Sequence, residues 1–289
     1  MASTQQLKSR IRSVKNTKQI TKAMQMVAAS KMRRAQEADK ASAPYTQAAS
    51  ELLTYFASQG ETKDHPLFAT RSVKRRLLIV IASDKGLAGA YNSNVAKAYL
   101  RELQADQKEN IGNATISVGR KASQFVTRLK DTEIIGVYDN LPDQPDGSEL
   151  RPILETAREQ FVTGVVDAVD VIYTKFISSI AQQATVLRVL PAGFESTDVT
   201  TEIRAAVYEP STQAVLDGVA YRLVGAQIFQ ALLDARASEH SMRMIAMKNA
   251  TDNAGQLADD LTLEMNKARQ GAITQELAEI SGGVEALNE

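Results

Sequence analysis

The sequence predicts an α/β protein in which a long antiparallel coiled coil of the N- and C-terminal helices is joined to a doubly wound, mostly parallel (Rossmann-like) α/β domain. Both ends of the chain repeat apolar residues with the spacing of one helix face, and the middle alternates between strand-like and helix-like patterns. The two ends also differ in charge. We therefore expect residues 1–58 to form the N-terminal coiled-coil helix, residues 74–208 the α/β globular domain and residues 211–287 the C-terminal long helix.

The C-terminal segment contains no proline between residues 211 and 287. At about 1.5 Å per residue, a helix of this length would extend on the order of 115 Å, which exceeds the width of a globular protein of this size. It must therefore pack against another long helix or lie inside a partner. Its apolar stripe consists of Leu257, Leu261, Met265, Ala268, Ala272, Leu277, Ile280, Val284 and Leu287.

An apolar stripe also runs along the N-terminal segment, where alanines keep the helix slim. Nine basic residues and no acidic residue precede Glu37. Pro44 should kink or divide this helix, because proline removes a backbone donor and clashes with the preceding turn. The stripe consists of Leu7, Ile11, Val14, Ile20, Met24 and Val27.

Between the end segments, short runs rich in β-branched residues alternate with helical patterns. The clearest run covers 76–82, and its continuous apolar character is typical of a strand buried on both faces. Such alternation indicates a mostly parallel sheet. The other expected strands are 115–118, 133–137, 169–176 and 185–190, with 203–208 as a possible last strand, and helices are expected up to about Asn110 and over 119–129 and 149–166.

The two end helices should form an antiparallel hairpin, because both leave the same domain and their charges are complementary. Residues 1–58 carry ten basic and three acidic groups, whereas residues 211–289 carry six basic and eleven acidic groups. Equal rise along both helices places Met1 opposite about Ala268, so about twenty residues from Arg269 onward have no partner within the chain. Since a lone helix with an apolar stripe is unfavourable in water, we expect another protein to surround this tip.

Composition excludes several kinds of chemistry. The chain has zero formal net charge, no cysteine and only two histidines, His65 and His240. Thiolate metal sites, cysteine nucleophiles and histidine-rich metal sites are therefore excluded. No serine-hydrolase, zinc-protease or calcium-loop motif is present, and no apolar run is long enough to cross a membrane. We expect a protein without catalytic residues, metal or cofactor, with His65 on the surface and His240 partly covered in the hairpin.

Two other functions remain open from the residues alone. The glycine-containing turn Ser83–Asn92 lies between a strand and a helix, where α/β folds bind phosphates, and could form the nucleotide site of an enzyme. It lacks the spacing of either common phosphate-binding motif, which favours a structural turn. The basic N-terminal helix could make the chain a nucleic-acid-binding protein. Residues 1–44 contain no aromatic residue for base stacking, which favours helix pairing instead.

Several motifs, in order along the chain, carry a resemblance to a known family. They are IRSVKNTKQITKAM at 11–24, MVAASK at 26–31, SDKGLAG at 83–89, ASEHSMRMIAM at 237–247, ATDNA at 250–254, NKARQ at 266–270 and ITQEL at 273–277. These motifs resemble the signatures of the gamma subunit of F-type (rotary) ATP synthases, in its bacterial type. The family often has Arg and Cys where this chain has Lys85 and Ala88. The resemblance covers both ends and the centre of the chain.

The resemblance implies a central-stalk (rotor) subunit, which transmits torque between the membrane c ring and the catalytic beta subunits and couples proton transport to ATP synthesis or hydrolysis. Such a subunit performs no bond chemistry and needs no cofactor. Its implied partners are the alpha and beta subunits of the hexamer, the epsilon subunit and the c-subunit ring, with no nucleic acid and no direct membrane insertion. The implied location is peripheral, on the cytoplasmic side of a bacterial cell membrane. The coupling ion, proton or sodium, is selected outside this subunit.

The resemblance also assigns residues by motif position. Met24 would lie near Arg243 and couple the two helices of the stem. Tyr208 and Glu209 match the region that contacts the c ring. The residues that would contact a beta-subunit loop and pass on torque are Arg269, Gln270 and Thr274.

Overall fold

The computed structural model describes residues 4–130, 132–142, 145–193 and 197–287. The chain divides into two compact units, one of residues 1–28 with 244–289 and one of residues 29–243. Two long helices, α1 (Thr4–Ser58) and α6 (Thr212–Leu287), each continue from one unit into the other. The expected three-part domain division remains a prediction, and the two units are described separately below.

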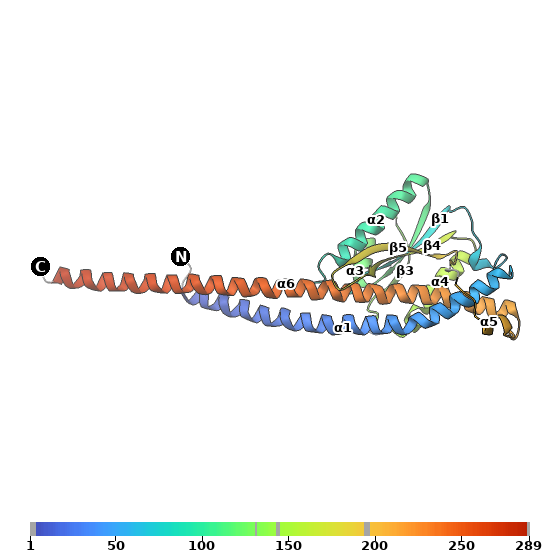
Figure 1. Cartoon of the computed structure of the whole chain (residues 1–289). Coiled ribbons are helices and arrows are strands. Elements are labelled where there is room, and N and C mark those ends of the chain that lie inside the picture. Colours follow the sequence, from blue (N-terminus) through green and yellow to red (C-terminus); the bar gives the residue numbers. More distant parts are fainter. Residues whose placement is uncertain (1–3, 131, 143–144, 194–196, 288–289) are drawn as a thin grey trace. The chain divides into compact units, whose positions relative to one another are not determined.

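The unit of residues 29–243 contains one five-stranded sheet in the order β3-β2-β1-β4-β5. Neighbouring strands among the first four are parallel, and β5 runs antiparallel to β4. This is the mostly parallel α/β fold that the sequence predicts (Figure 1). The strands are β1 (Arg75–Ile81), β2 (Gly112–Val118), β3 (Glu133–Tyr138), β4 (Ala168–Phe176) and β5 (Gln182–Leu190). The shorter helices are α2 (Tyr91–Glu109), α3 (Arg120–Val126), α4 (Arg151–Val162), α5 (Thr201–Ala205) and the 3-10 turns η1 (Pro66–Phe68) and η2 (Ser148–Leu150).

Strand β1 is buried on both faces, as its apolar run predicts. Leu77 and Ile79 belong to a core cluster that also holds residues of α4 and α6, whereas Leu78 and Val80 pack against α2 and α3. Successive residues of a strand point to opposite faces of its sheet, so β1 separates two helical layers. The long helix α6 therefore covers the sheet directly and supplies Val224, Ile228 and Leu232 to the core.

A buried ionic cluster crosses the middle of the sheet. Arg76 of β1 is 8% exposed and forms salt bridges with Asp170 of β4 at 2.6 Å and Asp106 of α2 at 2.6 Å. Glu102 adds a third contact to the same guanidinium at 2.9 Å, and Arg188 of β5 pairs with Asp170 from the other side. These pairs connect three strands and one helix. The sequence does not predict these pairs, because Arg76 is simply the first residue of the run 76–82, whose apolar character indicates only a buried strand.

The unit of residues 1–28 and 244–289 is an antiparallel helix pair. Leu7, Ile11 and Leu261 are buried together, and the Thr251 hydroxyl donates to the Thr21 hydroxyl at 2.8 Å. Residue numbers rise along α1 as they fall along α6, and the observed partners lie within about one helical turn of the expected register. The remaining apolar contacts around this cluster come from Val14, Met265 and Ala268.

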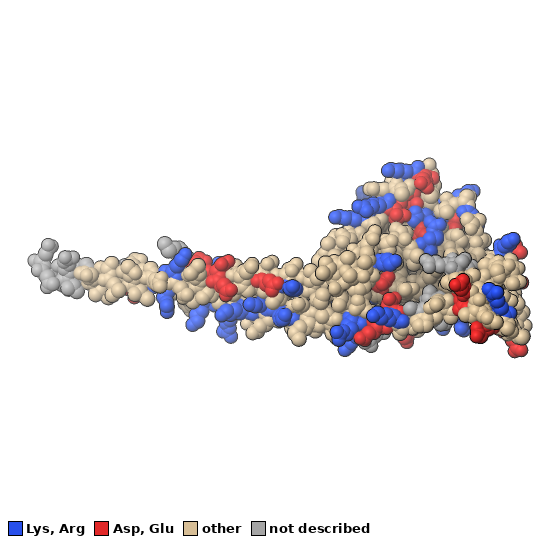
Figure 2. All heavy atoms as spheres, in the orientation of Figure 1, with Lys and Arg blue, Asp and Glu red and all other residues tan. Residues whose placement is uncertain are grey.

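Charge pairing between these two helices differs from the expectation. The basic side chains of α1 from Lys8 to Lys22 are exposed, and blue atoms follow α1 in Figure 2. Among the described residues of this unit, no salt bridge joins α1 to α6. Apolar packing and the threonine pair hold the helices together, because the long basic side chains extend into solvent, where a pair would gain little.

One expectation about local structure is wrong, and another is narrowed. The possible strand at 203–208 is instead the short helix α5 followed by exposed residues such as Val207, which is 86% exposed. Its apolar residues do not enter the sheet, whose edge beyond β4 is already formed by β5. Pro44, expected to kink or divide its helix, does not divide α1, which continues from Thr4 to Ser58, and the kink stays a prediction. A proline removes only one backbone hydrogen bond, and buried residues on both sides, Ala35 and Leu53, keep the helix packed.

Candidate functional site

Folds of this type bind ligands beyond the carboxyl ends of the parallel strands, where the strand order reverses. Here that position lies between β1 and β4, and the turn 83–90 follows β1 directly. Leu87 and Gly89 in this turn have φ angles of 61° and 56°. A non-glycine residue in this conformation is uncommon, so surrounding contacts must hold the turn.

Helix α6 supplies those contacts. The Arg243 guanidinium donates to the carbonyl oxygens of Lys85 at 3.0 Å and Gly86 at 3.2 Å. Glu239, one turn earlier, accepts from Arg243 at 2.8 Å and pairs with Arg236 at 3.4 Å. Both arginines and the glutamate are largely buried. The space where a related fold would hold a ligand is thus filled by side chains of the chain's own helix.

Asp84 extends this arrangement to the next two strands. Its Oδ1 accepts from the backbone N–H groups of Arg120 at 3.0 Å and Asn140 at 2.9 Å, and its Oδ2 lies 3.6 Å from Arg236. Gly119, just after β2, has a φ angle of 90°, and a Cβ there would lie 2.2 Å from the Ala82 carbonyl oxygen. The loops after β1, β2 and β3 therefore meet at Asp84 and are joined to α6. We call Asp84, Arg236, Glu239 and Arg243 the α6 charge cluster.

The same part of α6 also holds the end of β4 and the loop that follows it. The Ser238 hydroxyl donates to the Thr174 carbonyl oxygen at 3.1 Å, and the Ser241 hydroxyl donates to the Ser179 carbonyl oxygen at 2.6 Å. Beneath the cluster, burial and then the charge of Glu239 raise the pKa of Tyr91. The segment ASEHSMR, singled out in the sequence as a motif, is the part of α6 that fastens the α/β domain to the long helix.

The two histidines lie deeper than expected. His65 is 3% exposed rather than on the surface: its Nδ1 accepts from the Leu67 N–H at 3.2 Å and its Nε2 donates to Asp217 at 2.9 Å. The adjoining proline suggested an exposed loop, but the ring caps η1 and joins it to α6. His240 is 4% exposed and contacts Arg243 at 3.2 Å, so it is buried rather than partly covered.

The residues assigned by resemblance lie in several places. Met24 and Arg243 belong to different units, so their proximity stays a prediction. The Tyr208 hydroxyl donates to the Ile203 carbonyl oxygen at 2.7 Å, and its ring packs against Phe56 at 5.1 Å, while Glu209 is exposed. The structure thus leaves Glu209 accessible and ties Tyr208 to its own chain.

The C-terminal tip, residues 269–287 of α6, is exposed as far as its side chains are described. Arg269 and Gln270 have exposed side chains, and the Thr274 hydroxyl donates to the Gln270 carbonyl oxygen at 2.9 Å. The side chains of Val284 and Leu287 and the final residues 288–289 lie outside the described part of the chain. Large apolar side chains on the tip include Ile273, Leu277 and Ile280, which are 48%, 62% and 64% exposed.

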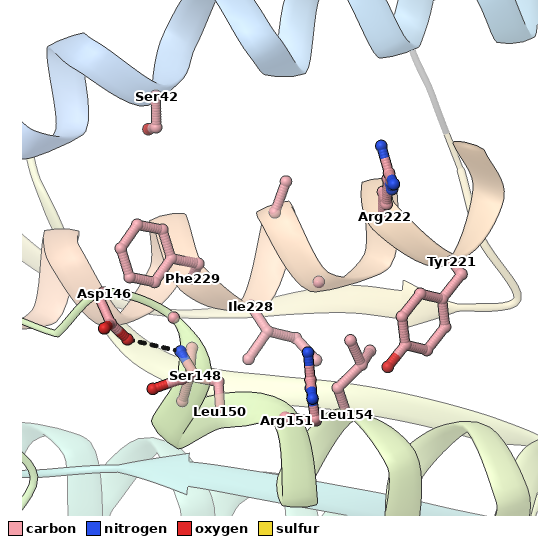
Figure 3. Close-up of a pocket in the computed structure, with 13 residues that line it drawn as sticks. Ser42, Asp146, Ser148, Leu150, Arg151, Leu154, Tyr221, Arg222, Ile228 and Phe229 are labelled. Carbon is pink, nitrogen blue, oxygen red and sulfur yellow. Dashed lines mark hydrogen bonds between the residues drawn. The ribbon is translucent and has the colours of Figure 1, made fainter. Parts of the chain in front are cut away.

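A cavity of about 740 Å³ lies elsewhere in the α/β unit, among α1, α4 and α6 (Figure 3). Leu154, Ile228 and Phe229 give it an apolar lining, and its Asp146 accepts from the Ser148 N–H at 2.9 Å. No histidine, cysteine or lysine is among its lining residues. Within the described residues, no cluster of three or more acidic, histidine or cysteine side chains could hold a metal ion. None of the described helices has a stretch long and apolar enough to cross a membrane.

The fold and the filled crevice define a class of proteins in which an α/β domain is fastened to a pair of long terminal helices. The family model described as ATP synthase matches residues 3–287. ATP synthase gamma chains from Stenotrophomonas maltophilia (strain R551-3) and Macrococcus caseolyticus (strain JCSC5402) are 39% and 40% identical over 288 residues, which cover 99% of this chain and 100% of each relative. The chain therefore belongs to the ATP synthase gamma chain family.

Solved structures agree with this assignment. The chain is similar to one in the Tetrahymena thermophila mitochondrial ATP synthase central stalk and c-ring structure, with a TM-score of 0.60 and 25% identity over 80% of this chain and 99% of that chain. A chain of the Euglena gracilis mitochondrial ATP synthase has a TM-score of 0.66 and 20% identity over 98% of this chain and 94% of that chain, which supports the fold. The resemblance seen in the sequence motifs is confirmed.

Proposed function

We propose that this chain is the central-stalk rotor of a bacterial F-type ATP synthase. In this role it transmits torque between the membrane c ring and the catalytic beta subunits and couples proton transport to ATP synthesis or hydrolysis. It performs no bond chemistry itself and needs no cofactor. Its partners are the alpha and beta subunits, the epsilon subunit and the c-subunit ring. It is peripheral, on the cytoplasmic side of the cell membrane.

The observation that carries this proposal is the exposed C-terminal tip. Ile273, Leu277 and Ile280 remain about half or more exposed on the tip. Exposed apolar stripes of this kind mark surfaces that another protein covers. A hexamer that surrounds the tip provides that cover. Arg269, Gln270 and Thr274 then lie where torque passes to a beta-subunit loop, and Tyr208 and Glu209 lie where the chain contacts the c ring.

The α6 charge cluster supports a mechanical role for the α/β domain. Arg243 and Glu239 are buried and bonded to the turn that an enzyme of this fold would use for phosphate binding. Because these groups are already paired, a nucleotide would have to displace them. This arrangement favours a non-catalytic subunit over an enzyme with its own nucleotide site. The nucleic-acid-binding alternative has no support among the matched proteins reported above.

The contact at the tip can be tested by the double variant Arg269→Ala with Gln270→Ala in the complete synthase. We expect normal assembly and a several-fold loss of ATP-driven proton pumping in membrane vesicles, because both side chains are exposed and neither supports the fold. Hydrolysis should fall less than pumping, since the variant weakens transmission rather than the catalytic sites.

A matched control is Gln107→Ala with Lys108→Ala, a neighbouring glutamine and basic residue exposed near the end of α2. This control should pump normally. Normal pumping by the tip variant, in a complex of normal composition, would show that Arg269 and Gln270 do not transmit torque. If the purified complex of the tip variant lacked beta subunits, Arg269 and Gln270 would instead be needed for assembly.

A further inference from the structure

A second, smaller cavity lies between α1 and α6 within the unit of residues 29–243. Its volume is about 290 Å³, and it shares no lining residue with the larger cavity of Figure 3. Helix α1 contributes lining residues between positions 34 and 38, α6 contributes Leu233 and Arg236, and the loop after β3 contributes Pro145. All of these segments belong to one compact unit, and both helices bring an arginine to the cavity.

Arg236, on the α6 side, is a buried guanidinium with unused hydrogen-bonding capacity. The residue is 7% exposed, and its Nη2 donates to the Leu141 carbonyl oxygen at 3.1 Å. Its contacts with Asp84 and Glu239, at 3.6 and 3.4 Å, are longer than the roughly 2.7–2.9 Å of a strong charge-assisted hydrogen bond. Its Nε is buried without a hydrogen-bond partner among the described residues. Because a buried donor without a partner costs free energy, a further acceptor beside this guanidinium would be stabilising.

Arg34, on the α1 side, brings a second guanidinium to the same cavity. Its side chain is exposed, and no salt bridge joins it to another residue in the described part of the chain. Glu37, one turn later on α1, is the acidic residue of the lining and is also exposed. Two guanidiniums therefore line the cavity against one carboxylate, and the excess positive charge attracts an anion.

The size and charge of the cavity define the class of anion. Pockets that hold drug-sized ligands measure about 300–1,000 Å³, so a cavity of about 290 Å³ suits a molecule smaller than a nucleotide. A phosphate monoester offers three acceptor oxygens and a charge of about −1.5 to −2 near pH 7, whereas a carboxylate offers two oxygens and a single charge. Arginine also binds phosphate oxygens in pairs. A phosphate group thus suits guanidiniums from two helices better than a carboxylate does.

We propose that this cavity is a binding site for a small phosphate-bearing anion, held between Arg34 of α1 and Arg236 of α6. The anion accepts from both guanidiniums and provides the acceptor that Arg236 Nε lacks. Glu37 weakens binding by repulsion, so the site depends on Arg34. An occupied site connects α1 to α6 beside the α6 charge cluster, since Arg236 belongs to both. The site is separate from the turn 83–90 and needs no other subunit, so it is independent of the proposed rotor function.

Arginine Nε–H resonances in nitrogen-15 NMR spectra of the full chain report on this site directly. Inorganic phosphate is titrated at constant ionic strength, with chloride as the balancing ion, so that general screening stays unchanged. In the wild type, the resonance of Arg236 should shift and saturate, with a Kd on the order of 1 mM. Arg34→Gln should raise this Kd at least about tenfold, because it removes a charge-assisted contact. Glu37→Gln should lower the Kd about two- to fivefold, because it removes a repulsive charge.

Two matched controls separate the site from the net charge of the chain. Arg33→Gln neutralises the adjacent exposed arginine, which does not line the cavity, and Glu109→Gln neutralises an exposed glutamate at the end of α2. Both variants should keep the wild-type Kd within about twofold. The same titration with glycerol phosphate identifies the source of the phosphate group. Tighter binding than that of inorganic phosphate indicates a phosphate monoester, and weaker binding indicates the free ion.

Water is the alternative occupant, because a polar cavity of this size admits it. An Arg236 resonance that does not shift, that shifts without saturation, or that shifts equally in the wild type and Arg34→Gln would overturn the proposal in favour of water.

Thermal denaturation provides an independent check. A ligand that binds only the folded chain raises its Tm, so phosphate should raise the Tm of the wild type more than that of Arg34→Gln. Equal increases would contradict an anion held by Arg34. Neither measurement involves torque or assembly, so failure of this proposal is distinguishable from failure of the rotor proposal.

Discussion

Replacement of Arg243 by alanine tests whether the α6 charge cluster fastens the α/β domain to the long helix. The guanidinium, with a side chain 11% exposed, donates to the carbonyl oxygens of Lys85 and Gly86 and to Glu239, whose side chain is 4% exposed. Arg243→Ala removes all of these bonds and leaves Glu239 with Arg236 as its remaining charged partner at 3.4 Å. Breaking one member of a buried ion pair costs about 3–5 kcal/mol, and we expect a loss of that order.

Urea denaturation of the full chain, followed by circular dichroism, measures this loss. A double-mutant cycle with Glu239→Gln separates the ion pair from the two carbonyl bonds, because the two side chains are in direct contact. The double variant should be less destabilised than the sum of the single variants, with a coupling of about 1–3 kcal/mol. Deuterium exchange in the turn 83–90 should increase in Arg243→Ala, because this turn then loses the contacts that hold Leu87 at a positive φ angle.

Lys248→Ala provides the control, because Lys248 is exposed one turn further along α6. Its effect should stay within about 0.5 kcal/mol. A loss below about 1 kcal/mol for Arg243→Ala, or additive effects in the cycle, would refute the idea that this buried arginine connects the turn to the helix.

Two further predictions concern buried charged groups in the α/β unit. Arg76→Met leaves Asp170 and Asp106, which are 1% and 2% exposed, without their shared guanidinium. Urea denaturation should show that the free energy of unfolding falls by about 3–5 kcal/mol, against less than about 0.5 kcal/mol for the exposed control Arg101→Met. Similar losses for both variants would contradict a structural role for the ionic cluster. Burial lowers the pKa of His65 despite the charge of Asp217. The wild type should therefore lose stability as pH falls below about 6.5, and His65→Gln should lose less stability over that range in thermal denaturation. An equal dependence of stability on pH in the wild type and the variant would show that His65 is not held neutral.

The sequence predicted the layers of this fold because local patterns encode them. The apolar run at 76–82 indicated a strand with two buried faces, and β1 has them. The length and periodicity of the end segments likewise predicted two helices that pair in opposite directions, and Leu7 with Leu261 confirms this. Where a prediction failed, at 203–208, the apolar residues were few and the edge of the sheet was already occupied.

The contacts within the α6 charge cluster could not be predicted in the same way. Asp84 and Arg236 are far apart in the sequence, and no periodicity indicates that a helix after the sheet returns to fill its ligand crevice. The prediction that His65 lies on the surface was wrong for the same reason, since its partner Asp217 belongs to a helix much later in the chain. One signal was available: two charged motifs, SDKGLAG and ASEHSMR, had no catalytic reading of their own. Each motif carries one acidic and one basic residue, so a contact between the two motifs was compatible with their charges.

The continuity of α6 gives these contacts a mechanical meaning. Residues 212–243 pack on the sheet and carry the α6 charge cluster, residues 244–268 pair with α1, and the tip from Arg269 onward is exposed, yet all belong to one helix without a proline or a break. A helix transmits torsion only if it does not unwind, and both its backbone hydrogen bonds and the elements packed against it resist unwinding. In the proposed rotor, torque applied to the α/β domain would therefore enter α6 through Arg236, Glu239 and Arg243, and pass along the same helix to the tip.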